Sequence, residues 1–144
     1  MPKCIDRIFE GAVGEELVAR LEFISPRTNL NCVVQLTDLI DSMIPEPDQN
    51  NPPPEEIEQL ERFYIFCLIW SLGGVLIEED REMFSDFVRN ESGLVLPPAS
   101  LYDEYFTIAK PSVFSRWDDL VPSYTAPANK KFSSILVPTV DTVK

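Results

Sequence analysis

The clearest amphipathic pattern in the chain starts just after Ser25-Pro26. Apolar residues then recur every three or four positions as far as Ile44, which is the spacing of one face of an α-helix. Thr28 or Asn29 can cap the start of this helix by accepting a hydrogen bond from an N–H group of the first turn. The predicted apolar stripe consists of Leu30, Val33, Val34, Leu36, Leu39, Ile40, Met43 and Ile44. The polar residues between them lack ligand or catalytic spacing, so we interpret as a solvated face the positions Asn31, Gln35, Asp38 and Asp41.

A second helical pattern runs from Glu55 to Leu72 and is apolar on every side between Phe63 and Trp70. A helix of this kind must be covered all round, so we predict that it is the central core element. Gly73-Gly74 then either ends the helix or lets a neighbouring part of the chain approach closely. Glu78 opens a further helix, whose predicted inner face consists of Met83, Phe84, Phe87 and Val88.

Two segments flank the first amphipathic helix. Residues 14–23 carry Leu17, Val18 and Leu21 at helical spacing, with acids in the first turn, and predict a short helix. Residues 45–54 contain five prolines in ten positions, which neither a helix nor a sheet interior tolerates. We therefore predict a proline-rich surface loop there.

After Asn90 the pattern changes to aromatic and β-branched runs punctuated by glycine and proline. Residues 102–109 and 113–118, separated by Lys110-Pro111-Ser112, predict a hairpin. A final strand is expected over 132–137. The fold class predicted from these elements is α+β, with helices in the first two thirds of the chain and a small sheet after them.

Charge and composition limit the possible partners. The 144 residues include 24 acids and 12 bases and no histidine, which gives a net charge of −12. This charge disfavours binding to nucleic acid or to an anionic membrane surface. The longest apolar run, 63–77, is shorter than the roughly twenty residues that span a bilayer, and no signal-peptide pattern follows Met1. Of the three cysteines, Cys32 and Cys67 lie in apolar helical patterns, where we expect buried, reduced thiols and hence a reducing, cytosolic compartment.

The residues that carry chemistry are mostly missing. None of the five glycines stands in a phosphate-binding loop of the form G-x-x-x-x-G-K-[ST]. Without histidine or paired cysteines, a zinc or haem site has almost nothing to coordinate through. The densest acidic cluster, Glu78, Glu79, Asp80 and Glu82, lies at a helix start, where the helix dipole and solvation explain it. We therefore predict no catalytic residue and no metal site in this chain.

Several short motifs in a fixed order resemble the dynein heavy chain. They are Phe66-Cys-Leu-Ile-Trp-Ser-Leu-Gly-Gly74 followed by Arg81 and Phe84, then Tyr102-Asp-Glu-Tyr105, Trp117, Val121-Pro122 and Ile135-Leu-Val-Pro-Thr-Val-Asp-Thr-Val-Lys144. Their order and spacing cover the chain from about Leu30 to Lys144. The stretch is similar to the region between the second and third AAA+ modules of axonemal dyneins.

The resemblance implies a division of the chain into four parts. Residues 1–13 form an N-terminal segment without an assigned place, and 14–92 form a helical AAA+ lid that includes the proline-rich loop 45–54. Residues 93–131 form a β-containing extension. Residues 132–144 form a strand that leads into the next, truncated AAA+ module.

The resemblance also implies how the parent protein works. The parent would be an ATP-dependent microtubule motor that uses ATP or ADP with Mg, whereas the P-loop, the acidic hydrolysis motif and the sensor are missing from this fragment. The fragment would relay nucleotide-dependent motion. In such modules the segment entering the large domain lies beside the adenine. In the intact motor, the resemblance therefore places near the nucleotide the residues Val137, Pro138, Thr139, Val140 and Asp141.

Partners and location follow from the same resemblance. The direct partners would be neighbouring AAA+ modules of the same heavy chain, and the parent motor would add dynein complex subunits and microtubules. The location would be the cytoskeleton, in a ciliary or flagellar axoneme.

Two other functions stay open from the residues themselves. A stand-alone acidic interaction module would use the proline-rich loop to recruit a basic partner. An enzyme would need a cleft that holds carboxylates with perturbed pKa values.

Overall fold

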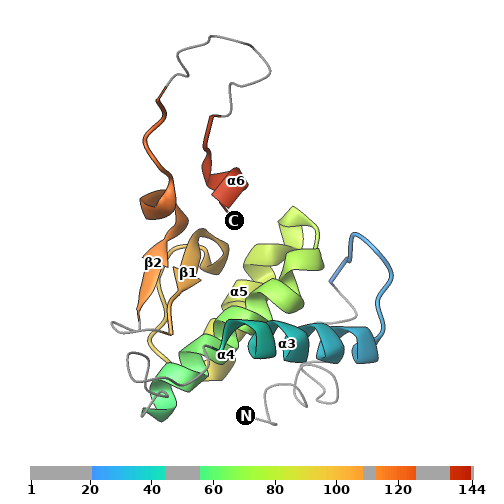
Figure 1. Ribbon diagram of the computed structural model, residues 1–144. Helices are drawn as coiled ribbons and strands as arrows, with labels where there is room; N and C mark the ends of the chain where they lie inside the picture. The colour runs from blue at the N-terminus through green and yellow to red at the C-terminus, as the bar shows by residue number, and fades with distance from the viewer. Residues whose placement is uncertain (1–20, 45–55, 109–112, 126–136, 144) are drawn as a thin grey trace.

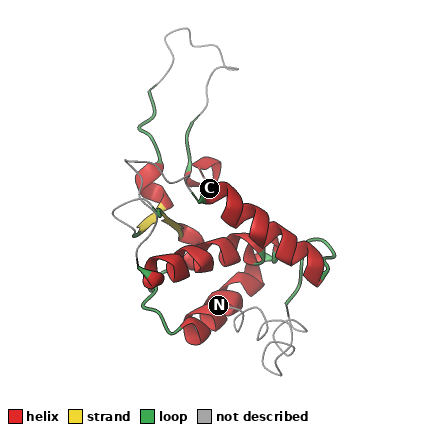
Figure 2. Ribbon diagram, turned by 60° about the horizontal axis from the view of Figure 1, so that its bottom comes forward, coloured by secondary structure: helices red, strands yellow, loops and turns green. Residues whose placement is uncertain are grey.

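The computed structural model describes residues 21–44, 56–108, 113–125 and 137–143. Three helices of 15 residues each make up most of it: α3 (Asn29–Met43), α4 (Ile57–Ser71) and α5 (Glu78–Ser92). A small antiparallel hairpin lies at one side of this helical body (Figures 1 and 2). The shorter elements are η1 (Gly73–Val75), η2 (Leu101–Asp103), β1 (Glu104–Phe106), β2 (Phe114–Arg116), η3 (Trp117–Leu120) and α6 (Val140–Val143). The predicted α+β class is confirmed.

Helix α4 is the centre of the core, as its sequence predicts. It packs against α3, η1, η2 and β1. Cys67 and Leu68 are 0% exposed. Along the predicted all-apolar stretch, the buried residues are Phe63, Ile65, Phe66, Cys67, Leu68 and Ile69. Burial on this scale is worth about 1.5–3 kcal/mol for each large apolar side chain, so α4 supplies a large share of the hydrophobic stabilisation.

Helix α3 forms with nearly the predicted bounds because Thr28 caps it. The Asn31 N–H donates to Thr28 Oγ1 over 3.2 Å, and the Thr28 N–H donates to Asn31 Oδ1 over 3.3 Å. This reciprocal pair satisfies two N–H groups at the helix start. The predicted stripe is only partly buried, however. The buried residues of α3 are Cys32 and Leu36, while Leu30 stays 71% exposed.

The predicted helix over 14–23 does not extend to its described end. Residues 21–23 are not helical, and Phe23 forms an antiparallel bridge with Leu76. The Ile24 N–H donates to the Val75 carbonyl over 2.9 Å. Pairing with the chain after η1 therefore satisfies the backbone here and outweighs the local helical pattern. Residues 14–20 lie outside the described residues.

Helix α5 starts at Glu78, as its sequence predicts, but its inner face is different. Gly93 ends the helix with φ +67°, a left-handed conformation that glycine adopts without strain. Phe84 and Val88 are buried as predicted and Phe87 is half-buried, whereas Met83 is 41% exposed. Ser85 is fully buried instead. The prediction was wrong for Met83 because α5 packs against η1 and turns the face through Phe84, Ser85 and Val88 inward, and the sequence pattern does not fix that rotation.

The hairpin forms at the predicted place. Residues Glu104, Tyr105 and Phe106 pair with Arg116, Ser115 and Phe114, respectively. The strands are shorter than predicted, because η2 occupies residues 101–103 and η3 begins at Trp117. The rings of Phe106 and Phe114 lie 5.0 Å apart across the strands. Pairs of this kind stabilise a sheet locally.

The end of the chain departs from the predicted strand over 132–144. Residues 140–143 form the short helix α6, which packs against η3. Thr142 Oγ1 accepts a hydrogen bond from the Thr139 N–H over 2.9 Å and donates to the Thr139 carbonyl over 2.8 Å. This local bonding by threonine favours a turn over an extended chain. Residues 132–136 lie outside the described residues, as do 1–13 and the loop 45–54, so those predictions stay untested.

Membrane and metal predictions can be compared with the described residues alone. Within these ranges, no helix has the length and apolar character needed to cross a membrane. The same ranges hold no cluster of three or more His, Cys, Asp or Glu side chains that could bind a metal ion.

Candidate functional site

The helices and the hairpin are joined where Tyr102 packs against Gly73. Tyr102 belongs to η2 and is buried, and Gly73 is buried at the start of η1. The Tyr102 hydroxyl occupies the space that a Cβ atom on Gly73 would need, and Phe84 Cδ1 lies 2.9 Å from the same position. Only glycine fits there, because any side chain would overlap both aromatic residues. Of the two possible roles of Gly73-Gly74, the close approach of a neighbouring side chain applies to Gly73.

Aromatic rings continue this contact into the hairpin. The Trp70 ring lies 6.1 Å from Tyr102 and 5.9 Å from Trp117, and both pairs meet edge to face. Tyr105 lies 5.3 Å from Trp117. Aromatic pairs with this geometry each add about 0.5–1.5 kcal/mol beyond their buried area. The rings therefore hold the hairpin against the end of α4, and this junction is the candidate functional site.

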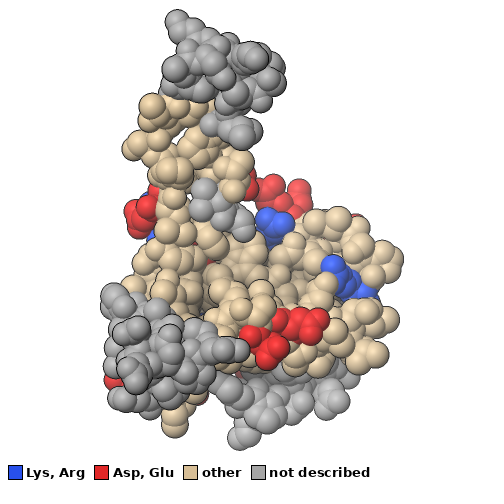
Figure 3. Space-filling view, in the orientation of Figure 1, with Lys and Arg blue, Asp and Glu red and all other residues tan. Residues whose placement is uncertain are grey.

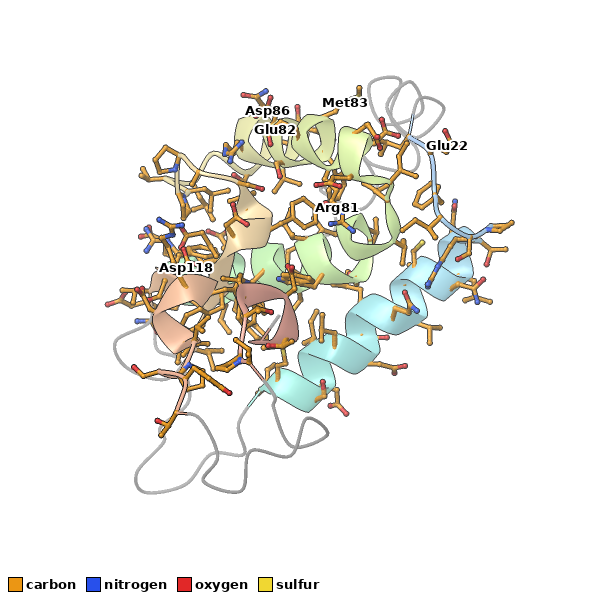
Figure 4. All side chains as sticks on the ribbon, turned by 90° about the horizontal axis from the view of Figure 1, so that it is seen from above. Glu22, Arg81, Glu82, Met83, Asp86 and Asp118 are labelled. Carbon is orange, nitrogen blue, oxygen red and sulfur yellow. The ribbon has the colours of Figure 1, made fainter. Side chains whose placement is uncertain are left out.

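Arg81 lies on the inner side of α5, next to the same junction. Its Cζ atom is 5.3 Å from the centroid of the Tyr102 ring. In Figure 4, Arg81 points toward the middle of the molecule, whereas Glu82, Met83 and Asp86 lie at the outer edge of α5. Among the described residues, Arg81 forms no ion pair and no hydrogen bond. The aromatic contact helps to hold the guanidinium in place, and the Nε of Arg81 is buried without a hydrogen-bond partner within the described residues.

The hairpin contains a buried carboxyl group, that of Glu104, and burial disfavours its charged form. Glu104 is 8% exposed. Burial raises the pKa of Glu104, Arg116 beside it lowers that pKa, and the neighbouring Asp103 and Asp119 raise it further. Arg116 forms its own ion pair with Asp118, so it offsets the burial of Glu104 only in part.

The last described segment holds the residues that the resemblance places near adenine. Val137 is 53% exposed, Thr139 and Asp141 are exposed, and Pro138 and Val140 are half-buried. Thr139 and Thr142 bond to each other.

Comparison with known families decides what kind of chain this is. The sequence model of the dynein heavy chain AAA lid domain matches residues 3–119. The chain belongs to the dynein heavy chain AAA lid family. The matched range includes all three long helices, the junction around Gly73 and the hairpin. It also crosses the predicted boundary between lid and extension at residues 92 and 93.

Individual relatives are heavy chains of axonemal and flagellar dyneins. The chain is 38% identical over a 155-residue alignment to the dynein-1-alpha heavy chain of the flagellar inner arm I1 complex of Chlamydomonas reinhardtii. It is 31% identical over 159 residues to human dynein axonemal heavy chain 10. These alignments cover 97% and 100% of this chain. The chain spans only 3% of the length of each of these relatives.

Sequence reasoning located the junction but not its geometry. The sequence predicts Trp70 in the core and Trp117 in the hairpin, and the structure brings both together with Gly73 and Tyr102. The contact of Arg81 with Tyr102 was missed. The spacing from Arg81 to the buried Phe84 is one helical turn, which was the available signal.

Proposed function

We propose that this dynein lid chain relays nucleotide-dependent motion through a motor ring as a rigid unit, without a reaction centre of its own. The observation that carries the proposal is the packing of Tyr102 against Gly73 and Phe84. Packed cores of this kind pass on displacements as whole bodies, because they do not deform continuously. A shift of the helices would therefore move the hairpin with them.

The experiment loosens the junction inside the intact heavy chain. Tyr102→Ala removes a buried aromatic ring and leaves a cavity between α4, η1 and the hairpin. We expect microtubule gliding velocity to fall several-fold while ATP binding is retained, because the ring would still load nucleotide but would lose the coupled motion. Met83→Ala, at a partly exposed position on the outer side of α5, is the control and should glide at the wild-type rate.

The proposal would be wrong under two results. Gliding and ATP turnover by Tyr102→Ala could match those of the wild type even though a melting experiment shows the variant to be destabilised. Alternatively, the purified 144-residue chain could hydrolyse ATP at the rate of a motor, which would give it a reaction centre of its own.

The nucleotide contact is proposed separately for the intact motor. ATP or ADP with Mg would bind outside this chain, and Val137, Pro138, Thr139, Val140 and Asp141 would lie beside the adenine. Exposed Val137 would cover one face of the base, and the Asp141 carboxylate would accept from its amino group. Photolabelling of the intact heavy chain with 8-azido-ATP should modify a peptide containing 137–141. Labelling confined to other peptides would exclude this contact.

The cellular setting is proposed from the relatives. They are described as axonemal or flagellar heavy chains. The direct partners would thus be neighbouring AAA+ modules of the same heavy chain, and the setting would be the cytoskeleton of a cilium or flagellum, where dynein subunits and microtubules join through the parent motor. A tagged full-length heavy chain should localise along the axoneme, and an exclusively cytoplasmic signal would contradict this.

A further inference from the structure

An open groove of about 600 Å³ runs between α3 and the end of α4. Residues from α3 form one wall, and the end of α4 together with η1 forms the other. The residues that matter for recognition are Gln35, Asp38 and Ser42 on the first wall and Trp70, Gly74 and Val75 on the second. Of these, Gln35 and Asp38 belong to the polar face that the sequence predicts to be solvated.

The polar groups of the first wall have unused bonding capacity. Within the described part of the chain, the side chains of Gln35 and Asp38 form neither a hydrogen bond nor an ion pair. Ser42 Oγ donates to the Leu39 carbonyl over 2.9 Å, so its lone pairs are still free to accept. Figure 3 shows acidic side chains exposed on the face that carries α3. The wall thus offers a carboxylate, an amide and a hydroxyl oxygen to a donor-rich cation.

The second wall of the groove combines the aromatic ring of Trp70 with Gly74, which has no side chain. The Trp70 side chain is half-buried, so part of its ring remains available. A Cβ atom on Gly74 would meet only Trp70 Cε3, at 3.9 Å. Packing therefore does not require glycine at this position, and its missing side chain leaves the groove open beside the tryptophan.

We propose that this groove receives an arginine side chain from another segment of the same heavy chain. A guanidinium presents five N–H donors in a plane, can bond a carboxylate with two of them, and stacks on aromatic rings. Lysine has a compact charge and lacks the planar donor set, so it fits this wall less well. The groove is open along the surface, so a side chain of a protein segment can enter it from outside. The relatives show that the chain spans only 3% of such a protein, so most of the heavy chain lies outside it.

The proposal rests on the proposed function, since it assigns a contact through which the lid would be held in the ring. It is tested on the 144-residue chain alone, so the result does not depend on motor activity. N-acetyl-arginine methylamide is titrated in a ¹⁵N NMR experiment, with N-acetyl-citrulline methylamide as the neutral isostere. We expect the arginine compound to shift the Gly74 amide and the Trp70 indole signals saturably, and the citrulline compound to leave them in place.

Two matched variants test the residues. Asp38→Asn should weaken arginine binding by about fivefold or more, whereas Asp41→Asn, one turn along α3 and outside the groove, should stay within about twofold. Gly74→Leu should abolish the shifts by filling the groove. The proposal would be overturned by equal shifts with the two compounds, by equal weakening in the two aspartate variants, or by no saturable shift at all.

The source of the arginine is tested in the purified full-length heavy chain. A photo-crosslinking amino acid at Gln35 should join an arginine-bearing peptide of the same heavy chain, and Asp38→Asn should reduce the yield several-fold. A crosslink to another subunit, or a yield that Asp38→Asn does not change, would overturn the assignment. Failure of the Tyr102→Ala gliding test would leave these results intact, so the two proposals can fail separately.

Discussion

The side chain of Tyr102 packs directly against the backbone of Gly73. The hydroxyl oxygen of Tyr102 fills the space beside the Gly73 α-carbon, and Phe84 closes the same space from α5. The two residues are far apart in the sequence, yet the Tyr102 hydroxyl leaves no room for a side chain at position 73. Burial among these neighbours raises the pKa of the Tyr102 hydroxyl above its ordinary value, and nearby Arg81 lowers it in part. A phenol held in this way stays neutral, so the junction is a steric contact and not an ionic one.

The two adjacent glycines should respond differently to alanine. Gly73→Ala should lower the free energy of unfolding by about 1–3 kcal/mol, because the new methyl group overlaps Tyr102 and Phe84. Gly74→Ala should change it by less than about 1 kcal/mol, because its methyl group meets only Trp70 at van der Waals distance. Urea unfolding followed by circular dichroism measures both.

Tyr102→Phe in the Gly73→Ala background provides the control. It removes the hydroxyl that blocks the methyl group, so it should restore part of the lost stability. Equal effects of the two single alanine substitutions, or no coupling between positions 73 and 102, would contradict the steric account.

Ser85→Ala should stabilise the chain. Ser85 is fully buried on α5, and its hydroxyl has no hydrogen-bond partner within the described residues. Removing an unsatisfied buried hydroxyl, and adding the helix preference of alanine, should together raise the free energy of unfolding by roughly 1 kcal/mol. Met83→Ala, at an exposed position of the same helix, is the control and should not raise the free energy of unfolding in this way. A loss of stability in Ser85→Ala would mean that the hydroxyl has a partner.

Glu104 should make the stability fall as the pH rises. Its pKa in the folded chain is raised above the usual 4.5, first because the carboxyl is buried. The folded state therefore binds the proton more tightly than the unfolded state does, and this contribution to stability is present in full below about pH 4.5 and is lost as the pH rises through the folded pKa. Glu104→Gln should be more stable than the wild type at pH 7 and should show a weaker decline between pH 4.5 and 7. Parallel curves for the two proteins would contradict the assignment.

Cys67 should be unreactive while the chain is folded. It is 0% exposed, and burial raises the pKa of its thiol to about 12. At pH 8 only about one Cys67 in ten thousand would then be a thiolate, the form that reacts. In a Cys4→Ser, Cys32→Ser variant, Ellman's reagent should label Cys67 only at the rate of unfolding, and urea should raise that rate. Rapid labelling of the folded variant would show that α4 is not enclosed.

The sequence alone determined where the three long helices and the hairpin lie. Thr28, the apolar run from Phe63 to Trp70 and the acids after Ile77 act through neighbouring residues, and such local signals can be read directly. The buried state of Cys32 and Cys67 also followed from the pattern. The ordered motifs were specific enough to indicate the dynein family, to which the chain belongs.

Only the tertiary structure decided how the faces of the helices are turned. Met83 and Leu30 are apolar and lie at helical spacing, yet they are exposed, whereas Ser85 is buried. The pairing of Phe23 with Leu76 likewise replaced a helical end by an extended segment. These outcomes depend on contacts between residues distant in sequence, which fix the rotation of each helix and the use of each glycine. A periodic pattern shows which residues are apolar, but whether each of them is buried depends on how the elements pack against one another.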